Sequence, residues 1–257
     1  MGKDFEDMLL SVYREDPCGT LPNAFWKTRR LIDDFKTDFR EVDGGVQFLK
    51  MWDDQSLHVY WDRDDEFQLD DRFVKNAKFM LLHDKYREEI SFDEFSNVKS
   101  YFRIIHKNDV PEPGLPAGFS FKDVDTGGEC KEVSDLIGRC YEDLKPSADE
   151  VDSWTGHDVF DEKLWIWVFD EEKKDHVGLG IAEIDRVVPE ASLEWIQVVP
   201  EYSGYGLGKA LVHELLRRVE GKVDFTTVSG EYREGGPMEF YKNCGFQGED
   251  IWWVLRR

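Results

Sequence analysis

The sequence predicts an α/β (α+β) protein with a mixed, mostly antiparallel sheet flanked by helices, and a smaller α+β region at its N-terminus. Three observations support this fold class. Strand and helix patterns alternate through the second half, two apolar runs there flank a polar turn of hairpin length, and a Pro/Gly-rich stretch at 111–118 precedes this half. We therefore expect an accessory region at 1–113 and a second domain at 114–257.

The second half is expected to fold as a regular succession of elements. Period-two apolar patterns and aromatic or β-branched enrichment predict strands, whereas apolar spacing of three and four residues predicts helices. The helix at 207–219, for example, places Leu207, Leu211 and Leu215 on one face. Strands are predicted at 119–124, 164–169, 176–184, 193–199, 223–228 and 251–255, and helices at 128–144, 148–154, 207–219 and 237–243.

The first half is less regular. Helices are predicted at 25–39 and 72–88, a hairpin from 45–52 and 57–61, and a further strand at 101–106. We find no catalytic signature there and no repeat of the second half, so this region is expected to be structural or to shape a substrate site.

Composition limits the possible functions. The chain of 257 residues carries a formal net charge of −22, which argues against nucleic acid as a main partner. Its four cysteines form no Cys-x-x-Cys motif, its histidines show no metal-type spacing, and no apolar run could cross a membrane. We expect a reduced cytoplasmic protein without a metal, a nucleic-acid partner or a membrane partner.

The most informative segment is a turn with glycines at every second position, directly before the helix at 207–219. Gly204, Gly206 and Gly208 let a ligand approach the main chain, and the unpaired N–H groups of a helix's first turn attract anions. A dinucleotide fingerprint would need glycine where Lys209 stands, and a P-loop would need Ser or Thr at Ala210. Both motifs fail, so a phosphate site at this turn would be of another kind, and the turn by itself is weak evidence for one.

The wider context narrows its identity. A strand, the segment Val198–Leu211, a helix, a strand and then Phe240-Tyr241-Lys242-Asn243-Cys244-Gly245-Phe246 resemble the GNAT superfamily of acetyl-CoA-dependent N-acetyltransferases. The resemblance covers roughly 115–257, and the whole chain resembles a bacterial and archaeal subgroup with an N-terminal helper region. It implies direct transfer of acetyl from acetyl-CoA to a primary amine of a small molecule, peptide or protein.

The resemblance also implies which residues bind the cofactor. They are Gln197, Val198, Val199, Ser203, Gly204, Tyr205, Gly206, Leu207, Gly208, Lys209 and Ala210. The family motif begins with Gln or Arg, but the two possible registers here begin with Glu201 or Ser203, and Glu234 stands where the family often has Asn. Phosphate binding is therefore expected to depend on main-chain N–H groups, with Lys209 as the nearest cation.

Two residues are candidates for catalysis. An alkylammonium has a pKa of about 10.4 and must lose a proton before its nitrogen can attack. A carboxylate can accept that proton. Glu194 is the first candidate for this base, with Glu190 and Glu183 as alternatives. Tyr241 matches the family tyrosine that protonates the departing thiolate.

Other interpretations remain open at this stage. Cys244 could form an acetyl-enzyme, but no histidine is nearby in sequence and we interpret it as a packing residue. The chain could instead be a non-catalytic acyl-CoA sensor, or an acyltransferase for longer acyl chains. The amine acceptor is not predicted, and the chain could be a monomer or a homodimer.

Overall fold

The structure is a computed structural model that describes residues 2–107, 112, 114–141 and 144–257. These residues form two compact units, which we describe separately. Unit 1 contains residues from 1–105, 228–242 and 246–257, and unit 2 contains residues from 106–227 and 243–245. The predicted boundary at residue 113 lies outside the described residues, as do Pro111 and Pro113 of the predicted linker. The division at 113 stays a prediction.

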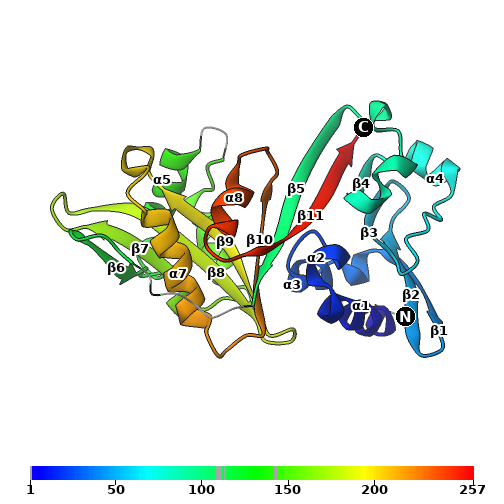
Figure 1. The fold of residues 1–257 in the computed structure, drawn as a ribbon, viewed down its shortest axis with the longest axis horizontal. Helices are drawn as coiled ribbons and strands as arrows, with labels where there is room; N and C mark the ends of the chain where they lie inside the picture. Colours follow the sequence, from blue (N-terminus) through cyan, green and yellow to red (C-terminus); the bar gives the residue numbers. More distant parts are fainter. Residues whose placement is uncertain (1, 108–111, 113, 142–143) are drawn as a thin grey trace. The chain divides into compact units, whose positions relative to one another are not determined.

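Figure 1 labels the helices and strands. The helices are α1 (Gly2–Glu15), α2 (Pro17–Thr20), α3 (Phe25–Arg29), α4 (Asp71–Asn76), α5 (Cys130–Cys140), α6 (Ala148–Trp154), α7 (Leu207–Val219) and α8 (Pro237–Lys242). Short 3₁₀ turns are η1 (Ile32–Asp34), η2 (Asp84–Glu89), η3 (Phe92–Glu94), η4 (Glu162–Leu164) and η5 (Pro200–Tyr202). The strands are β1 (Lys36–Val42), β2 (Gly45–Trp52), β3 (Ser56–Asp62), β4 (Phe79–His83), β5 (Asn97–His106), β6 (Phe119–Asp123), β7 (Trp165–Asp170), β8 (Asp175–Asp185), β9 (Glu190–Val198), β10 (Phe225–Glu231) and β11 (Gln247–Arg256).

Unit 1 is built on a sheet with the strand order β1-β2-β3-β4-β11-β5. Strands β1, β2 and β3 form an antiparallel meander, which confirms the predicted hairpin of β2 and β3. Strand β4 runs parallel to β3, but only Ser56 and Leu57 of β3 find partners in it, so the two strands soon separate. The last strand of the chain, β11, pairs antiparallel with both β4 and β5.

Two helices predicted in the first half are wrong. The segment 72–88 is helical only over α4 and then forms β4, in which Met80 and Leu82 are buried on alternate positions. The segment 25–39 is helical only over α3 and continues into η1 and the edge strand β1. In both segments a short period-two pattern, satisfied by sheet pairing, overrides the longer helical spacing.

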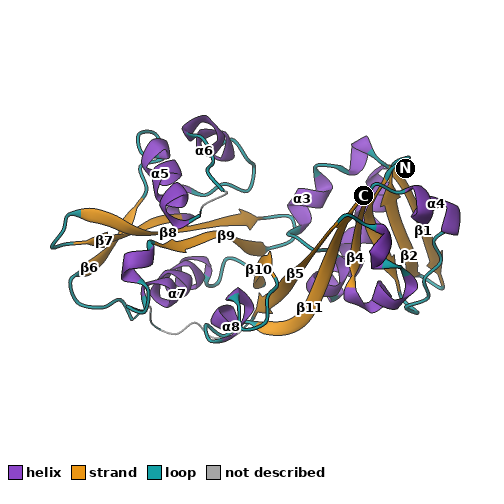
Figure 2. Cartoon of the chain, turned by 90° about the horizontal axis from the view of Figure 1, so that it is seen from above, coloured by secondary structure: helices purple, strands orange, loops and turns teal. Residues whose placement is uncertain are grey.

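Unit 2 has the strand order β9-β8-β7-β6, with β10 next to β9. The pairs among β6, β7, β8 and β9 are all antiparallel. Figure 2 shows α5 and α6 over one face of β7, β8 and β9, and α7 over the other. Helix α7 has the predicted bounds, whereas α5 is shorter than predicted and ends at Cys140. The predicted fold class, a mixed and mostly antiparallel sheet flanked by helices, is confirmed.

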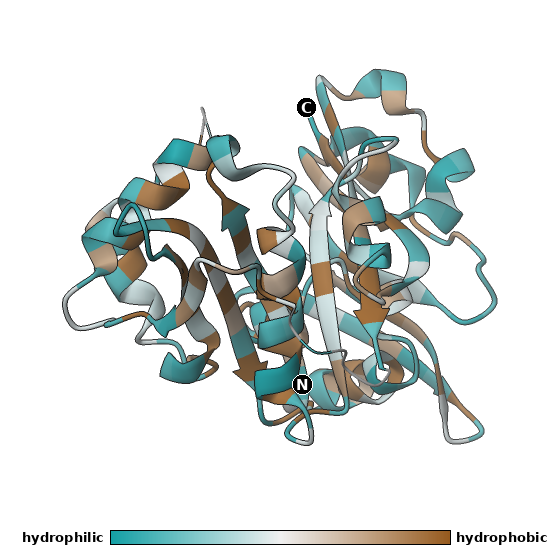
Figure 3. Ribbon diagram, turned by 60° about the vertical axis from the view of Figure 1, so that its left-hand side comes forward, coloured by the Kyte–Doolittle hydropathy of each residue, from teal (hydrophilic) through white to brown (hydrophobic). Residues whose placement is uncertain are grey.

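One face of β7 and β8 carries an aromatic core that packs against α6. Leu179 and Ile181 are fully buried, as are the opposing Trp165 and Trp167 of β7. Trp165 and Trp154 of α6 lie with ring centroids 6.2 Å apart, so this face carries an aromatic core beneath α6. Figure 3 shows hydrophobic residues concentrated along the strands, while the exposed turns are mostly hydrophilic.

The order of elements in the first half repeats in the second. Helices α1 to α3 precede the meander β1–β3, then α4, then β4 beside β3, then short 3₁₀ turns and β5. Likewise α5 and α6 precede the meander β7–β9, then α7, then β10 beside β9, then α8 and β11. This repeat was not predicted from the sequence, because very different residues can satisfy the same apolar spacing.

Candidate functional site

The glycine turn joins β9 to α7 in unit 2. After β9 ends at Val198, η5 makes one 3₁₀ turn and the chain passes through Ser203–Gly206, all of which are exposed. Gly204 has φ 84° and Gly206 has φ 81°, values in the left-handed region that favour glycine. A Cβ at either position would meet no atom within 4 Å. The main chain here is therefore open to a ligand.

The first turn of α7 is available as an anion site. Gly206 is the residue that caps the helix, and among the described residues no side-chain cap is found there. The helix's first N–H groups, at the positive end of the helix dipole, favour a phosphate group. Lys209 is exposed in this first turn. The first turn of α7 therefore has the features of a main-chain anion site.

A buried hydrogen bond links the residue before the glycine turn to the end of β7. The hydroxyl of Tyr202 donates to Asp170 Oδ2 at 2.7 Å. The other oxygen, Oδ1, accepts from the N–H groups of Glu172 and Lys173 in the turn between β7 and β8. These donors lower the pKa of Asp170, the Lys173 N–H most of all. No local sequence pattern predicts this contact, because Asp170 and Tyr202 are far apart along the chain.

Glu194 lies at an irregularity in β9. Leu193 pairs with Ala182 and Trp195 pairs with Ile181, so Glu194 is an extra residue in the β8–β9 ladder. Its carboxylate is half-buried and accepts a 2.9 Å hydrogen bond from Ser192 Oγ.

The two alternative bases are more deeply buried than Glu194. Glu190 is 1% exposed and accepts a 2.5 Å hydrogen bond from the hydroxyl of Thr227. Glu183 is 6% exposed and its Oε1 lies 3.4 Å from Nδ1 of His157. Of the three carboxylates, Glu194 is the most accessible to an acceptor, which favours it as the base.

At the end of β9, the Gln197 side chain offers a hydrogen-bond acceptor, whereas the backbone N–H of Val199 is already bonded. Gln197 is buried, and its Oε1 has no hydrogen-bond partner among the described residues. The N–H of Val199 donates to the carbonyl of Val177 at 3.0 Å. That N–H is therefore not available to a ligand, and the Val199 carbonyl already accepts the N–H of Tyr202 at 3.0 Å.

Tyr241 belongs to unit 1. It lies in α8, half-buried, with ring centroids 5.0 Å from Phe240 and 6.0 Å from Phe102 of β5. Its carbonyl accepts the N–H of Phe246 at 3.2 Å, which closes the loop after α8. Glu194 and the glycine turn are brought together in unit 2, whereas Tyr241 falls in the other unit.

Cys244 is poorly suited to nucleophilic catalysis. Its thiol is buried, and burial raises its pKa to about 11. A thiol with that pKa is almost entirely protonated near neutral pH. This favours the interpretation of Cys244 as a packing residue.

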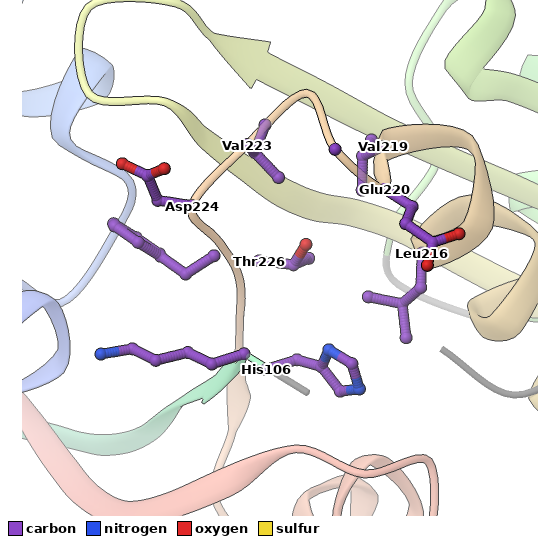
Figure 4. A pocket seen from close by; sticks show the side chains of 10 residues that line it. His106, Leu216, Val219, Glu220, Val223, Asp224 and Thr226 are labelled. Carbon is purple, nitrogen blue, oxygen red and sulfur yellow. The ribbon is translucent and has the colours of Figure 1, made fainter. Parts of the chain in front are cut away.

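A cavity of about 180 Å³ lies at the other end of α7 (Figure 4). It is bordered by His106 and Lys107, by Leu216 and Val219 of α7, and by Glu220, Gly221, Val223, Asp224, Phe225 and Thr226. A helix of this length spans about 20 Å, which separates the cavity from the glycine turn at the N-terminal end. The cavity is therefore distinct from the glycine turn.

In unit 1, the turn at the same point in the order of elements, between β3 and α4, is acidic and lacks glycine. Between β3 and α4 the chain reads Arg63-Asp64-Asp65-Glu66-Phe67-Gln68-Leu69-Asp70, with no glycine. Asp62 Oδ1 accepts the N–H groups of Asp64 and Glu66, and Lys85 pairs with Asp65 at 2.6 Å. A turn this acidic repels phosphate, so unit 1 offers no second pyrophosphate site at this position.

Among the described residues, no three or more His, Cys, Asp or Glu side chains are arranged to hold a metal ion. No helix in that part of the chain is long and apolar enough to span a lipid bilayer.

Comparison with known proteins finds similarity to GNAT acetyltransferases. Residues 162–248 match the family described as "Acetyltransferase (GNAT) domain". The chain is also 33% identical over 79 residues to GCN5-related N-acetyltransferase 2, chloroplastic, of Arabidopsis thaliana. That match covers 31% of this chain and only 30% of the plant protein.

Solved structures share the fold at low sequence identity. A GCN5-related N-acetyltransferase from Sphaerobacter thermophilus matches with a TM-score of 0.68 at 13% identity, over 91% of this chain and 85% of that one. A GNAT-family acetyltransferase from Colwellia psychrerythraea matches with a TM-score of 0.61 at 12% identity, over 91% and 90%. A tandem GNAT protein from the clavulanic acid biosynthesis pathway matches with a TM-score of 0.58 at 14% identity, over 99% and 94%.

Proposed function

We propose that this chain, whose residues 162–248 match the GNAT acetyltransferase domain, is an N-acetyltransferase of that superfamily that transfers acetyl from acetyl-CoA to a primary amine. Family membership supports acyl transfer in general, and the donor, the acceptor and the residue roles are our proposal. The narrower assignment to a bacterial and archaeal subgroup stays a prediction.

The observation that carries the proposal is the open glycine turn at the head of α7. Gly204 and Gly206 have positive φ and empty space around them, and the first N–H groups of α7 have no side-chain cap among the described residues. In a protein with a net charge of −22, an anionic cofactor needs such local dipoles, because the overall field repels it.

The proposed reaction needs three proton transfers. Glu194 accepts a proton from the acceptor ammonium, directly or through one water, and the neutral amine then attacks the thioester carbonyl carbon. The C–N bond forms, the C–S bond breaks, and the departing thiolate takes a proton from the hydroxyl of Tyr241. The acetylated nitrogen then loses its second proton, through solvent, to the tyrosinate, which gives the neutral amide and restores Tyr241. Main-chain groups at the end of β9 are suited to bind the pantetheine and polarise the thioester carbonyl.

We propose one cofactor site for each chain. Unit 2 carries the glycine turn, whereas the turn at the same point of unit 1 is acidic and lacks glycine. The N-terminal region 1–113 then has an accessory role, either structural or in shaping the acceptor site. A cytoplasmic location, a monomer or homodimer, and the absence of nucleic-acid and membrane partners are part of the same proposal.

The test combines binding and turnover. Calorimetry with acetyl-CoA is expected to give one site per chain, and a panel of small and peptide amines is expected to release free coenzyme A only when a suitable acceptor is present. The main alternative is a non-catalytic acyl-CoA sensor. Binding at one site without thiol release on any acceptor would favour the sensor, and no binding at all would overturn both proposals.

A further inference from the structure

We propose that Lys173, Tyr205 and Phe119 form a subsite beside the glycine turn for the 3′-phosphoadenosine end of coenzyme A. This inference rests on the proposed function, because it assumes that the glycine turn holds the cofactor's pyrophosphate. It adds to the main-chain site and Lys209 a second cation, Lys173, and assigns a role to the Tyr205 ring; together these distinguish coenzyme A from other pyrophosphates.

The aromatic surface is on the turn itself. Tyr205 stands between Gly204 and Gly206 and is 56% exposed, more than any other large hydrophobic side chain among the described residues. Its ring centroid is 5.7 Å from that of Tyr202 and 6.2 Å from that of Phe119, which approaches it edge-on at 76°. The ring is therefore supported from the side while much of its surface stays open. An open, supported aromatic ring is suited to stack on a purine base.

The cation comes from the turn between β7 and β8. Lys173 Nζ lies 4.7 Å from the ring centroid of Tyr202. The Tyr202 hydroxyl raises the pKa of Lys173 most, and Asp170 and Tyr205 also contribute, so the side chain is fully charged at neutral pH. In the ion pairs found among the described residues, Lys173 has no carboxylate partner, whereas its neighbour Lys174 pairs with Glu171 at 3.0 Å. Lys173 thus remains available to an incoming anion.

The three side chains are held at one end of the unit 2 sheet. Phe119 begins β6 directly opposite Asp170, the last residue of β7. Asp170 in turn binds the hydroxyl of Tyr202 and the N–H of Lys173. One buried carboxylate therefore fixes the positions of both the lysine turn and the glycine turn. This rigidity lets the lysine and the aromatic ring act on one ligand at low entropic cost.

The chemistry of coenzyme A matches this arrangement. Its pyrophosphate leads to an adenosine that carries a separate phosphate monoester at the ribose 3′ position. A monoester is a dianion near neutral pH and pairs with an ammonium group, while the adenine offers a π face for Tyr205. The distinguishing test is 3′-dephospho-CoA, which keeps the pyrophosphate and adenine but lacks this monoester.

Two matched lysine variants test the cation. Calorimetric dissociation constants for CoA and 3′-dephospho-CoA would be measured for the parent protein, Lys173→Gln and Lys174→Gln. We expect Lys173→Gln to weaken CoA binding by about 5- to 10-fold and dephospho-CoA binding by less than about 2-fold, as for one partly exposed ionic contact. Lys174 is already paired with Glu171, so Lys174→Gln is expected to change neither dissociation constant.

A third variant tests the aromatic surface. Tyr205→Ala is expected to weaken both CoA and dephospho-CoA by a similar factor of about 5 to 10, since both contain adenine. If Lys173→Gln weakens both ligands equally, or if the parent protein binds both equally, the subsite is wrong although the glycine turn still binds the cofactor. If the parent protein binds neither ligand, the proposed function itself fails.

Discussion

Gly180 of β8 lies directly beneath Leu211 of α7. A Cβ built on this glycine would stand 3.1 Å from Leu211 Cδ2, 3.1 Å from Leu215 Cδ1 and 3.2 Å from Ile166 Cγ1. The glycine therefore sets how closely α7 approaches the sheet, and with it the height of the glycine turn above the end of β9.

We expect Gly180→Ala to destabilise the protein by overpacking. The three neighbours are core side chains that cannot all move aside, and such substitutions cost about 1–3 kcal/mol. Urea unfolding followed by tryptophan fluorescence would measure the free energy of unfolding. Gly45→Ala is the control, because its nearest neighbour would be the Val42 carbonyl at 3.7 Å, an ordinary contact. Equal stability of the two variants would contradict this packing argument.

Gly206→Val is expected to lower affinity for acetyl-CoA by at least about tenfold. The new side chain would project into the open space above the turn, and the residue would keep a φ of 81° that valine tolerates poorly, at about 1–2 kcal/mol. Gly44→Val suffers the same strain at φ 79°, also with empty space around it, but in the β1–β2 turn. Calorimetry should show unchanged binding for the Gly44 variant. Normal affinity of Gly206→Val would remove the glycine turn as the phosphate site.

Tyr241→Phe is expected to lower kcat by about 10- to 100-fold with little change in KM for acetyl-CoA. The variant loses only the hydroxyl that protonates the thiolate, and general acid catalysis contributes about this much or more. Tyr232→Phe, an exposed tyrosine of the same unit, serves as the control in steady-state assays of thiol release. An unchanged kcat would exclude Tyr241 as the general acid.

Glu194→Gln is expected to lower kcat/KM by about 100-fold at pH 7. The loss should shrink as the pH approaches the pKa of the free amine, because the acceptor then loses its proton without help. Glu183→Gln is the informative comparison, since its carboxylate is more buried and lies 3.4 Å from His157. A larger loss in the Glu183 variant than in the Glu194 variant would reassign the base.

Stability is expected to fall as the pH drops from 7.5 to 5.5. Burial lowers the pKa of His58, His106, His176 and His213 below the usual value of 6.5. Below pH 6.5 the unfolded chain therefore binds more protons than the folded protein, so protonation favours unfolding. Urea titrations at pH 7.5, 6.5 and 5.5 would measure the trend.

His213→Gln should reduce that pH dependence. His213 is buried in α7 and its charge also opposes protonation of His106, so replacing it removes one titrating group and relieves the other. Equal free energies of unfolding at pH 7.5 and 5.5 in the parent protein would refute the prediction.

Local sequence patterns were enough for the helix that follows the glycine turn. Leu207, Leu211 and Leu215 recur at helical spacing after a glycine, which gives α7 its observed bounds. The same patterns failed in the first half, where the segments predicted as helices at 25–39 and 72–88 contain the start of β1 and all of β4. A short strand is stabilised by its partners in the sheet, and those partners are distant in sequence.

By itself, the sequence determined the fold class, the GNAT resemblance and the position of the glycine turn, because each depends on residues adjacent in the chain. Only the tertiary structure revealed the bond from Tyr202 to Asp170, the extra residue at Glu194 in the β8–β9 ladder, and the placement of Lys173 beside the turn. It also joined β11 to the strands of the first half. These features depend on register and on contacts between distant segments, which arise only when the whole chain packs.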